Sequence, residues 1–545
     1  MKYQITLLLF FLASLALGQE KTTIFSGVNI IDAESGTIKN NQHVVIQKGM
    51  IQAIESKIGK KYSDAEIIPV EGKWMIPGLI DAHVHFFQSG GLYTRPDVID
   101  LRKLVPYEEE QKRVWEQKED FMKRYLSVGI TDVCDVGGPM TNYQVRDFAD
   151  STDVSPHVYI TGPLISSYQP EEFQIDDSPI IKVNSPEEAR QLVRKQVPLR
   201  PDFIKIWFIV LRGQTPQMHM PIIEATIDES QKHGIPVAVH ATQLETARLA
   251  VKAGAKILVH SVDDKEVDQE FIDLLKEKEV SYIPTMVVSD NYEKVLSQNL
   301  DFSLSEQEVA NPFILGSLMD LQHIEPAYIP RWVKSLMETP YSPLSKISVM
   351  QKNLKKIADA GVNIVTGTDA GNIGTLHASS YQTEILAMQK AGLSNRQILQ
   401  ASTINGAKML GRIKQTGSIE VGKLADFVII QNNPLENIGS IFNIDKVIKG
   451  GVIYEPGELM AASPEEIVQR QLNAYNLGDI DAFMETYHRD IHIYNFPDQP
   501  LFQDWEIVRQ RYAELFANNP DLHCEIVNRI VEGNRVIDQE KVTGL

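Results

Sequence analysis

Hydrophobic positions follow two different periods along the chain. Residues 22–76 contain short runs in which apolar and polar positions alternate, such as TTIFSGVNII and HVVIQKGMIQAIES, separated by glycine and asparagine turns. Alternation with a period of two is typical of strands that bury one face. A similar texture returns in GSIEVGKLADFVII, within residues 413–458. We therefore expect strands from both flanks to form one composite β-sandwich domain.

Residues 77–412 repeat a different unit, in which a polar stretch ends in glycine and a short apolar run follows at once. Four copies read SVGITDVCDVG, KHGIPVAVHAT, KAGAKILVHSV and DAGVNIVTGTD. The glycine suits the left-handed position that closes a helix, and the run suits a strand buried on both faces. Four further runs, PGLIDAHVHF, HVYITGPLI, DFIKIWFIV and SYIPTMVV, bring the number to eight. Eight is the number that a (β/α)8 TIM barrel requires, and a doubly wound open sheet is the less favoured alternative.

The pattern changes in two further segments. Residues 289–348 follow the seventh run and are rich in proline, asparagine and aromatic residues, which predicts a loop with short helices that could act as a lid. In residues 461–545, Ser463 and Glu466 form a capping signature, followed by a Gly-Asp break, a second helix and strands. This segment is expected to be a separate, small α+β domain.

Composition limits the class of partner. The 545 residues include 72 acidic and 53 basic ones, for a formal charge of −19, without a basic block. This balance argues against nucleic acid or an anionic membrane surface as partner, and it favours a small-molecule substrate. The hydrophobic fraction of 43% is that of an ordinary globular protein with sizeable cores.

The N-terminus has the features of a signal peptide over residues 1–18. Lys2 precedes an apolar stretch, Ile5 to Leu17, and small residues precede a plausible cut before Gln19. An uncleaved anchor is the less favoured alternative, because the stretch is shorter than the ~20 residues that span a bilayer. We expect an exported, periplasmic or secreted protein without membrane insertion after cleavage. The two cysteines, Cys134 and Cys524, fall in different predicted domains and are expected to be free.

Metal-binding residue types end four of the eight barrel runs. Barrel active sites are built at the carboxyl ends of the strands, so these residues would lie on one rim. Taken singly, each is explained as well by a hydrogen-bonded core histidine or a turn. Taken together they predict a metal site made of His83 and His85 after the first run, His240 after the fifth, His260 after the sixth and Asp369 after the eighth.

The fourth run, DFIKIWFIV, contains Lys205. A cation inside an apolar stretch costs several kcal/mol unless it is paired, exposed or neutralised. Lys205 could extend to the barrel rim or pair with a carboxylate. The alternative that we favour is a carbamate formed with carbon dioxide, which would be an anionic bridge between two metal ions.

At these motifs the chain resembles the amidohydrolase superfamily. The resemblance covers residues ~22–456 and rests on GKWMIPGLIDAHVHF, the strand-ending histidines, GTDAG and ASTINGAKMLGRIKQTGSIEVGKLADFVII. It is nearest to the imidazolonepropionase-like or prolidase-like branch. These motifs are specific for the superfamily and less so for a substrate.

The resemblance implies the roles of the site residues. His83, His85 and Asp369 would hold a buried metal, His240 and His260 an outer one, and carboxylated Lys205 would bridge the two. Imidazole and carboxylate ligands suit Zn²⁺, with Mn²⁺, Fe²⁺ or Co²⁺ as alternatives. A hydroxide held between the metals would attack an amide, a dipeptide or a cyclic amide, with Asp369 as general base and acid.

Three alternatives remain open at this point. A mononuclear deaminase is disfavoured because the chain reads HATQ, with Gln243 where adenosine-type deaminases carry a glutamate and Glu245 two residues later. An imidazolonepropionase-type hydrolase would use one metal without a lysine bridge. A secreted, non-catalytic binding protein would be expected to lack metal ligands, and all six positions are filled.

The remaining candidates lie toward the C-terminus. His377, in NIGTLHASS, could touch substrate or support a ligand, or be a loop histidine. Residues 461–545 resemble the SnoaL-like branch of the NTF2-like fold through QLNAYNLGDIDAFMETYHRDIHIYNFP, which implies ligand binding or dimerisation. We expect this domain to be incomplete, because the chain ends at Leu545 before the family's final strands. His488 and His492 are expected to be structural.

Overall fold

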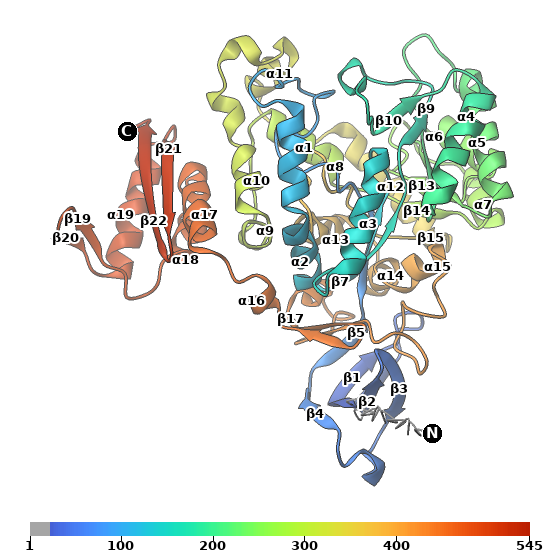
Figure 1. Cartoon of the computed structure of the whole chain (residues 1–545), viewed down its shortest axis with the longest axis horizontal. Helices are drawn as coiled ribbons and strands as arrows, with labels where there is room; N and C mark the ends of the chain where they lie inside the picture. The colour runs from blue at the N-terminus through green and yellow to red at the C-terminus, as the bar shows by residue number, and fades with distance from the viewer. Residues whose placement is uncertain (1–21) are drawn as a thin grey trace, which may run out of the picture.

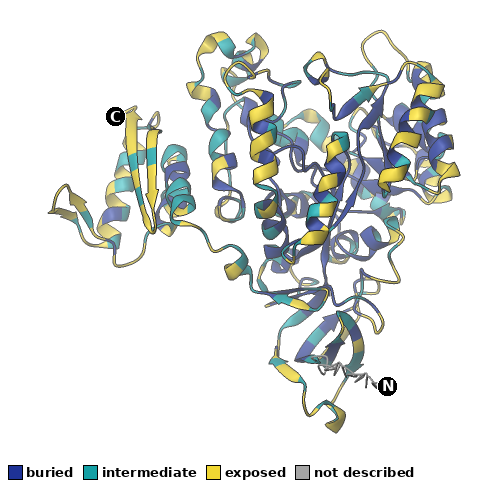
Figure 2. Cartoon of the chain, viewed as in Figure 1, coloured by how far each residue is buried: buried dark blue, intermediate teal, exposed yellow. Residues whose placement is uncertain are grey.

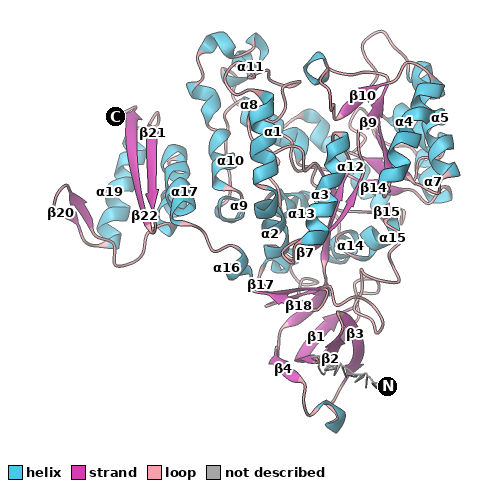
Figure 3. Ribbon diagram, in the orientation of Figure 1, coloured by secondary structure: helices cyan, strands magenta, loops and turns pink. Residues whose placement is uncertain are grey.

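The computed structural model describes residues 22–545, so the predicted signal peptide lies outside the described residues. Figure 1 shows a central body of strands surrounded by helices, a small β-domain at one end and a C-terminal domain beside the body. Figure 3 shows the alternation of strands and helices along the central body. The fold is a TIM-barrel α/β fold with an additional C-terminal domain.

Eight parallel strands occur in the order of the eight predicted runs: β6 Leu79–Val84, β7 Ile130–Asp135, β8 His157–Ile160, β11 Ile204–Trp207, β12 Val237–His240, β13 Ile257–Val259, β14 Ser281–Ile283 and β15 Asn363–Ile364. They pair in two groups, β6-β7-β8 and β11 to β15. Backbone hydrogen bonds span both seams, including bonds of 2.9 Å from Ala82 to Thr366 and from Asp202 to Ile160. The third run also continues into β9 Leu164–Ser166, beside the short edge strand β10 Ile180–Lys182, which the sequence did not predict.

The strands are buried because each lies between two apolar layers. Every residue of β6 and β7 is buried. One hydrophobic cluster, including Ile80, Cys134 and Val259, fills the inside of the barrel, and a larger one lies beneath the outer helices. Figure 2 shows dark strands and helices with one exposed face. This is the arrangement that runs of continuous apolar residues indicate.

The helices of the central body follow the strands and cover them. They are α1 Tyr107–Glu116, α2 Lys118–Ser127, α3 Tyr143–Ser151, α4 Pro186–Gln196, α5 Met220–Lys232, α6 Leu244–Ala253, α7 Gln269–Glu277, α12 Ser345–Asp359, α13 Ser380–Lys390, α14 Asn395–Ala401 and α15 Ile404–Met409. Gly254 closes α6 in the left-handed conformation, as the repeated glycine pattern indicates.

Strands from both flanks pair in one eight-stranded sheet. Its members are β1 Thr23–Ile31, β2 Ile38–Gln47, β3 Met50–Glu55, β4 Glu66–Pro69, β5 Trp74–Pro77, β16 Phe427–Ile430, β17 Ile444–Lys449 and β18 Val452–Tyr454. The two flanks join where β16 runs antiparallel to β5, with Val428 opposite Ile76. The arrangement of these strands in the two layers of a sandwich stays a prediction.

The predicted insertion consists of short helices: α8 Val288–Leu296, α9 Leu304–Val309, α10 Pro312–Ser317 and α11 Arg331–Met337. The C-terminal domain contains α17 Pro464–Leu477, α18 Ile480–Glu485, α19 Trp505–Asn518, the hairpin β19 Ile493–Asn495 with β20 Gln499–Phe502, and the hairpin β21 His523–Glu532 with β22 Arg535–Thr543. The capping box of Ser463 and Glu466 opens α17. Cys134 and Cys524 are free and buried. Across residues 22–545, no helix has the length and hydrophobicity needed to cross a membrane.

Arg124 on α2 joins three parts of the molecule. Its side chain is 2% exposed. The guanidinium donates to Asp120 on its own helix at 2.7 Å and to the carbonyls of Val309 and Ala310 in the insertion at 2.8 and 2.9 Å. It also donates to Glu466 of the C-terminal domain at 3.1 Å. One buried cation therefore holds the insertion and the C-terminal domain against the barrel.

Replacing Arg124 by methionine should loosen this junction. Two carboxylates and two carbonyls lose a charged donor, and because Asp120 and Glu466 remain partly exposed to solvent we expect a cost of about 1–3 kcal/mol. We expect faster amide hydrogen exchange in residues 304–317 and in α17, measured by mass spectrometry. The control is K123M on the same helix, because Lys123 forms an exposed pair with Glu119. Equal exchange in the two variants would contradict the assigned role of Arg124.

Candidate metal centre

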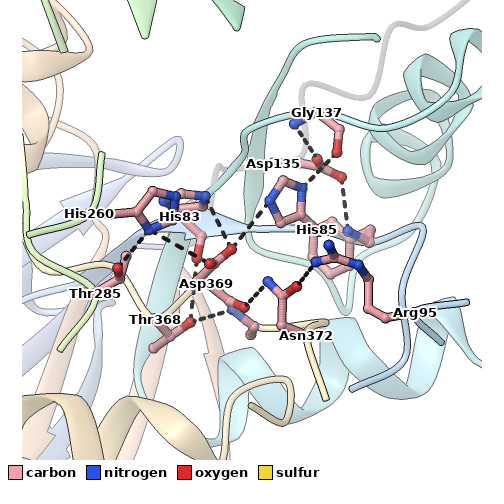
Figure 4. Close-up of polar contacts among 12 residues, drawn as sticks. His83, His85, Arg95, Asp135, Gly137, His260, Thr285, Thr368, Asp369 and Asn372 are labelled. Atoms are coloured by element: carbon pink, nitrogen blue, oxygen red, sulfur yellow. Dashed lines mark hydrogen bonds and ion pairs between the residues drawn. The ribbon is translucent and has the colours of Figure 1, made fainter. Parts of the chain in front are cut away.

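Five of the six predicted ligand positions lie at or after the carboxyl ends of strands, whereas Lys205 lies inside its strand. His83 lies in β6 and His85 directly after it, Lys205 lies in β11, His240 ends β12, His260 follows β13, and Asp369 follows β15. All six are buried or nearly so. Figure 4 shows His83, His85 and His260 grouped around the Asp369 carboxylate.

Three of these residues form the tightest cluster. The Nε2 atoms of His83 and His85 lie 3.2 and 3.3 Å from the same carboxylate oxygen, Oδ1 of Asp369. One ligand atom from each residue lies within 4.8 Å of the other two. This spacing fits a divalent ion with bonds of about 2.0–2.2 Å to nitrogen and oxygen.

The other three candidates lie on the open side of this cluster. The rings of His240 and His260 have centroids 4.4 Å apart, and Nδ1 of His260 lies 3.7 Å from Oδ2 of Asp369. Lys205 is 1% exposed, and its Nζ has no hydrogen-bond partner among the described residues. The positions assigned to a second metal therefore adjoin those assigned to the first.

Burial favours the neutral forms of these bases. It lowers the pKa of Lys205 to about 7, against the opposing effect of Asp369. It lowers the pKa of His240 to about 3, with nearby Lys205 as a further cause, and it holds the pKa of His83 well below its usual range. Neutral imidazole and neutral amine are the forms that donate a lone pair to a metal or react with carbon dioxide.

The GTDAG motif requires glycine at both ends because it packs closely against the first strand. A Cβ at Gly367 would lie 2.9 Å from the Cβ of His83, and one at Gly371 would lie 2.5 Å from the carbonyl oxygen of His85. Between them, Asp369 is left-handed with φ of 64° and donates its backbone N–H to the His83 carbonyl at 2.7 Å. The motif thus brings Asp369 against both histidines.

Left-handed residues gather at the ends of three successive strands. His260 has φ of 75° after β13, Thr285 has φ of 42° after β14, and Asp369 follows β15. Such conformations are uncommon for residues other than glycine and concentrate at functional sites. The hydroxyl of Thr285 lies 2.8 Å from Nδ1 of His260 and holds that ring. Sequence reasoning missed the role of Thr285, although this residue lies within the recognised run SYIPTMVV.

Two further contacts that sequence reasoning missed orient the first strand. Nδ1 of His85 donates to the carbonyl of Gly137 at 2.7 Å, which turns Nε2 toward Asp369. Beneath the ligands, Asp81 accepts from the hydroxyl of Thr368 at 2.7 Å. Burial raises the pKa of Asp81 to about 7.

The cluster opens into a cavity of about 420 Å³. Five of the six candidates contribute to its lining, with His83 beneath the surface. One wall is apolar and includes Leu164, Phe173 and Trp207, and the insertion supplies Val288, Tyr292, Leu296 and Lys346 among others. This is the size of a site for a small organic molecule.

The remaining candidates lie outside this cavity. His377 is buried against the rings of Phe86 and Phe121, bonded to the Tyr125 hydroxyl at 3.0 Å and the Gln88 carbonyl at 2.8 Å. His377 is buried and does not line the cavity, and its hydrogen bond to the Gln88 carbonyl fixes the loop after His85. Gln243 and Glu245 do not line the cavity. His488 is exposed in the C-terminal domain.

The eight-stranded fold and its rim of ligands define a TIM-barrel hydrolase site. The Amidohydrolase family model matches residues 74–454, and the SnoaL-like domain model matches residues 468–545. The chain belongs to the Amidohydrolase family. The predicted superfamily, hydrolase activity and SnoaL-like domain are confirmed.

Similar proteins cover most of the chain. Ochratoxinase from Aspergillus niger is 24% identical over 482 residues, 80% of this chain and 87% of the relative. Imidazolonepropionase from Brevibacillus brevis is 21% identical over 477 residues, 81% of this chain and 95% of the relative. The crystal structure of a Xaa-Pro dipeptidase with bound methionine superposes with a TM-score of 0.60 at 24% identity, covering 80% of this chain and 100% of the other.

Buried Glu384 on α13 should make the stability of the protein depend on pH. It accepts from the backbone N–H groups of Met286 and Val287, and burial raises its pKa from 4.5 to about 8. The folded state binds the proton more tightly than the unfolded state, so the stabilisation is present below pH 4.5 and is lost as the pH rises through about 8. Between these values we expect a loss of about 1.4 kcal/mol per pH unit from this group.

The measurement is urea unfolding of the wild type and E384Q from pH 5 to 9. The wild type should lose stability relative to E384Q across this range, because glutamine does not titrate. E277Q, at an exposed helical position, is the control and should follow the wild type. Parallel profiles for wild type and E384Q would show that Glu384 is ionised throughout.

Proposed function

We propose that the protein is a metal-dependent hydrolase that cleaves a carbon-nitrogen bond of an amide, a dipeptide or a cyclic amide. The observation that carries the proposal is the convergence of six residues with nitrogen or oxygen donors, five of which line one cavity while His83 lies directly beneath it. The proposal takes the eight strands as a closed barrel, for which the hydrogen bonds at the two seams are the support.

The unpartnered atoms of the site fit divalent metal. Both ring nitrogens of His83, Oδ1 of Asp369 and Nζ of Lys205 are buried without a hydrogen-bond partner among the described residues. Leaving such groups unsatisfied costs about 1–3 kcal/mol each, and metal ligation would satisfy one ring nitrogen of His83 and Oδ1 of Asp369. His83, His85 and Asp369 would hold one ion and His240 and His260 a second, with Zn²⁺ favoured by this ligand set.

Lys205 would bridge the two ions as a carbamate. Its neutral amine would add to carbon dioxide and release one proton, so a neutral group would become an anionic carbamate. The lowered pKa of Lys205 supplies the neutral amine at physiological pH. An anionic bridge between two cations removes the energetic penalty of a buried, unpaired ammonium.

Asp369 would be the general base and acid. Bound metal supplies an activated water of lowered pKa and a polarised substrate carbonyl. The carboxylate of Asp369 is held rigidly against both histidines, within reach of a proton released at the cluster. It would receive that proton at one oxygen and deliver it to the leaving nitrogen.

The cavity favours substrates with a bulky apolar group. Leu164, Phe173, Ile180 and Trp207 form a continuous apolar wall beside the ligands. A carbon-nitrogen bond is supported by the relatives, since the name Xaa-Pro dipeptidase denotes cleavage of a peptide bond. This one apolar wall next to the candidate ligands matches an amide that carries an aromatic or aliphatic side chain.

A mononuclear hydrolase or deaminase is the second candidate. It is favoured by one observation, that His83, His85 and Asp369 form a complete three-ligand cluster without the others. The deaminase form lacks support at Gln243 and Glu245, which lie outside the cavity. The number of metals per chain separates this candidate from the first.

Export of the protein is part of the proposal and rests on the sequence of residues 1–18. N-terminal sequencing of protein recovered from the periplasm or the medium should begin at Gln19. Recovery of protein that still begins at Met1 would overturn the proposed cleavage and export.

The metal content of the purified mature protein tests the site. We expect plasma mass spectrometry to find two metals per chain in the wild type and one or none in K205A, because the bridge would be lost. K256A, which changes an exposed lysine bonded to a backbone carbonyl away from the site, should retain both. One metal in both wild type and K205A would favour the mononuclear candidate.

Hydrolysis of an amide panel tests the activity. The panel contains X-Pro and X-Arg dipeptides, N-acyl amino acids with aromatic side chains, and lactams. D369N should lower kcat/KM by about 10³-fold, the contribution typical of a positioned acid and base. Silence of the wild type across the panel, or an unchanged D369N variant, would contradict the proposed reaction.

A further inference from the structure

Three polar side chains from separate elements meet beside Asp369. Arg95 lies in the loop between β6 and α1, Tyr292 on α8 of the insertion, and Asn372 just after β15. All three line the cavity. Figure 4 shows Arg95 directed at Asn372, and Asn372 directed at the segment that carries Asp369. No part of the sequence pattern singled out any of these residues.

The side chain of Asn372 is fixed in one orientation by its partners. Its Oδ1 accepts from Nη1 of Arg95 and from the hydroxyl of Tyr292, the latter at 2.6 Å. Nη1 of Arg95 also donates to the Tyr292 hydroxyl at 3.0 Å. With two donors on its oxygen, the amide must present its nitrogen on the other side, where Nδ2 donates to the carbonyl oxygen of Asp369 at 3.0 Å.

This hydrogen bond acts on a strained residue. Asp369 is left-handed, a conformation that costs about 1–3 kcal/mol for a residue other than glycine and persists only where the surroundings enforce it. The His83 carbonyl holds its N–H and Asn372 holds its carbonyl. The orientation of the carboxylate toward both histidines therefore depends on the amide of Asn372.

The charge of Arg95 is already matched within the protein. Its Nε and Nη2 donate to the two oxygens of Asp97 at 2.7 and 2.6 Å. The side chains of Arg95 and Asp97 are 16% and 7% exposed. A bidentate pair of this kind occupies the edge of the guanidinium that would otherwise bind a substrate carboxylate. The remaining edge, at Nη1, faces Asn372 and Tyr292.

We infer that Arg95 is a positioning residue for Asp369, acting through Asn372 and fastening Tyr292 of the insertion to the same point. The inference rests on the proposed metal-dependent function. Arg95 lines the cavity, but its side-chain hydrogen bonds go to Asp97, Tyr292 and Asn372 and to none of the candidate ligands, so it acts on Asp369 through Asn372. Partners that orient ligands typically contribute about 10- to 100-fold in metal affinity or activity.

The variants R95M, R95K and Y292F test this role. Methionine removes every donor, whereas lysine retains the charge but cannot reach Asp97 and Asn372 together with a planar fork. Y292F removes a single donor from Oδ1 of Asn372 and should have a smaller effect. R102M is the matched control, because Arg102 forms a similar two-point pair with Asp100 further along the same loop and does not line the cavity.

The primary measurement is the dissociation constant of Zn²⁺ from each full-length protein, obtained by competition with a chromogenic chelator. Kinetics on an amide that the wild type cleaves provide the second measurement, and thermal unfolding of the metal-free proteins identifies any variant that fails to fold. We expect the dissociation constant to rise about 10- to 100-fold in R95M and R95K. We also expect kcat to fall while KM is unchanged, with a smaller shift in Y292F and none in R102M.

Two results would overturn the positioning role alone. One is an unchanged metal affinity and kcat in folded R95M and Y292F. The other is an unchanged metal affinity with a raised KM, which would make Arg95 a substrate-binding residue. Absence of Zn²⁺ binding by the wild type would instead overturn the proposed function together with this inference.

Discussion

The close approach of the eighth strand segment to the first is the constraint on which the site depends. Gly367 leaves no side chain between the two segments, and the hydrogen bond from Ala82 to Thr366 joins them. Because of this contact, a carboxylate from residue 369 reaches two histidines almost 300 positions earlier in the chain. A larger residue at 367 would separate the segments, and the three-ligand cluster would open even with every ligand present.

Much of the centre could be predicted because its ligands end buried apolar runs. His240 and His260 follow runs that read as strands, and parallel strands place their carboxyl ends on one rim. The supporting residues could not be found in this way. Asn372 and Arg95 lie in loops without periodicity, and Thr285 lies in a recognised run whose pattern does not show that its hydroxyl contacts His260. All three roles depend on which segments meet in space. His377 stood out as a residue type, but its burial beneath the loop after His85 follows from tertiary packing alone.

The fold could be predicted from the sequence to about the same extent as the site. Alternation of apolar and polar positions indicates the flanking strands, and the glycine-ended repeat indicates the eight barrel strands. The edge strand β10 was missed because a three-residue run has too little pattern to separate it from a loop. The insertion was expected as loop and short helices, yet its position against the C-terminal domain depends on individual contacts, such as Asn473 donating to the Pro312 carbonyl.

Those contacts relate the C-terminal domain to the cavity. Gln307 in the insertion donates to Asp479 at 2.8 Å, and α8 at the start of the insertion supplies part of the cavity wall. The insertion thus lies between the barrel and the SnoaL-like domain, with fixed polar contacts on both sides. Contacts on both sides restrict the conformations open to the insertion, which lowers the conformational entropy that the part of the cavity wall formed by α8 would lose on binding a ligand.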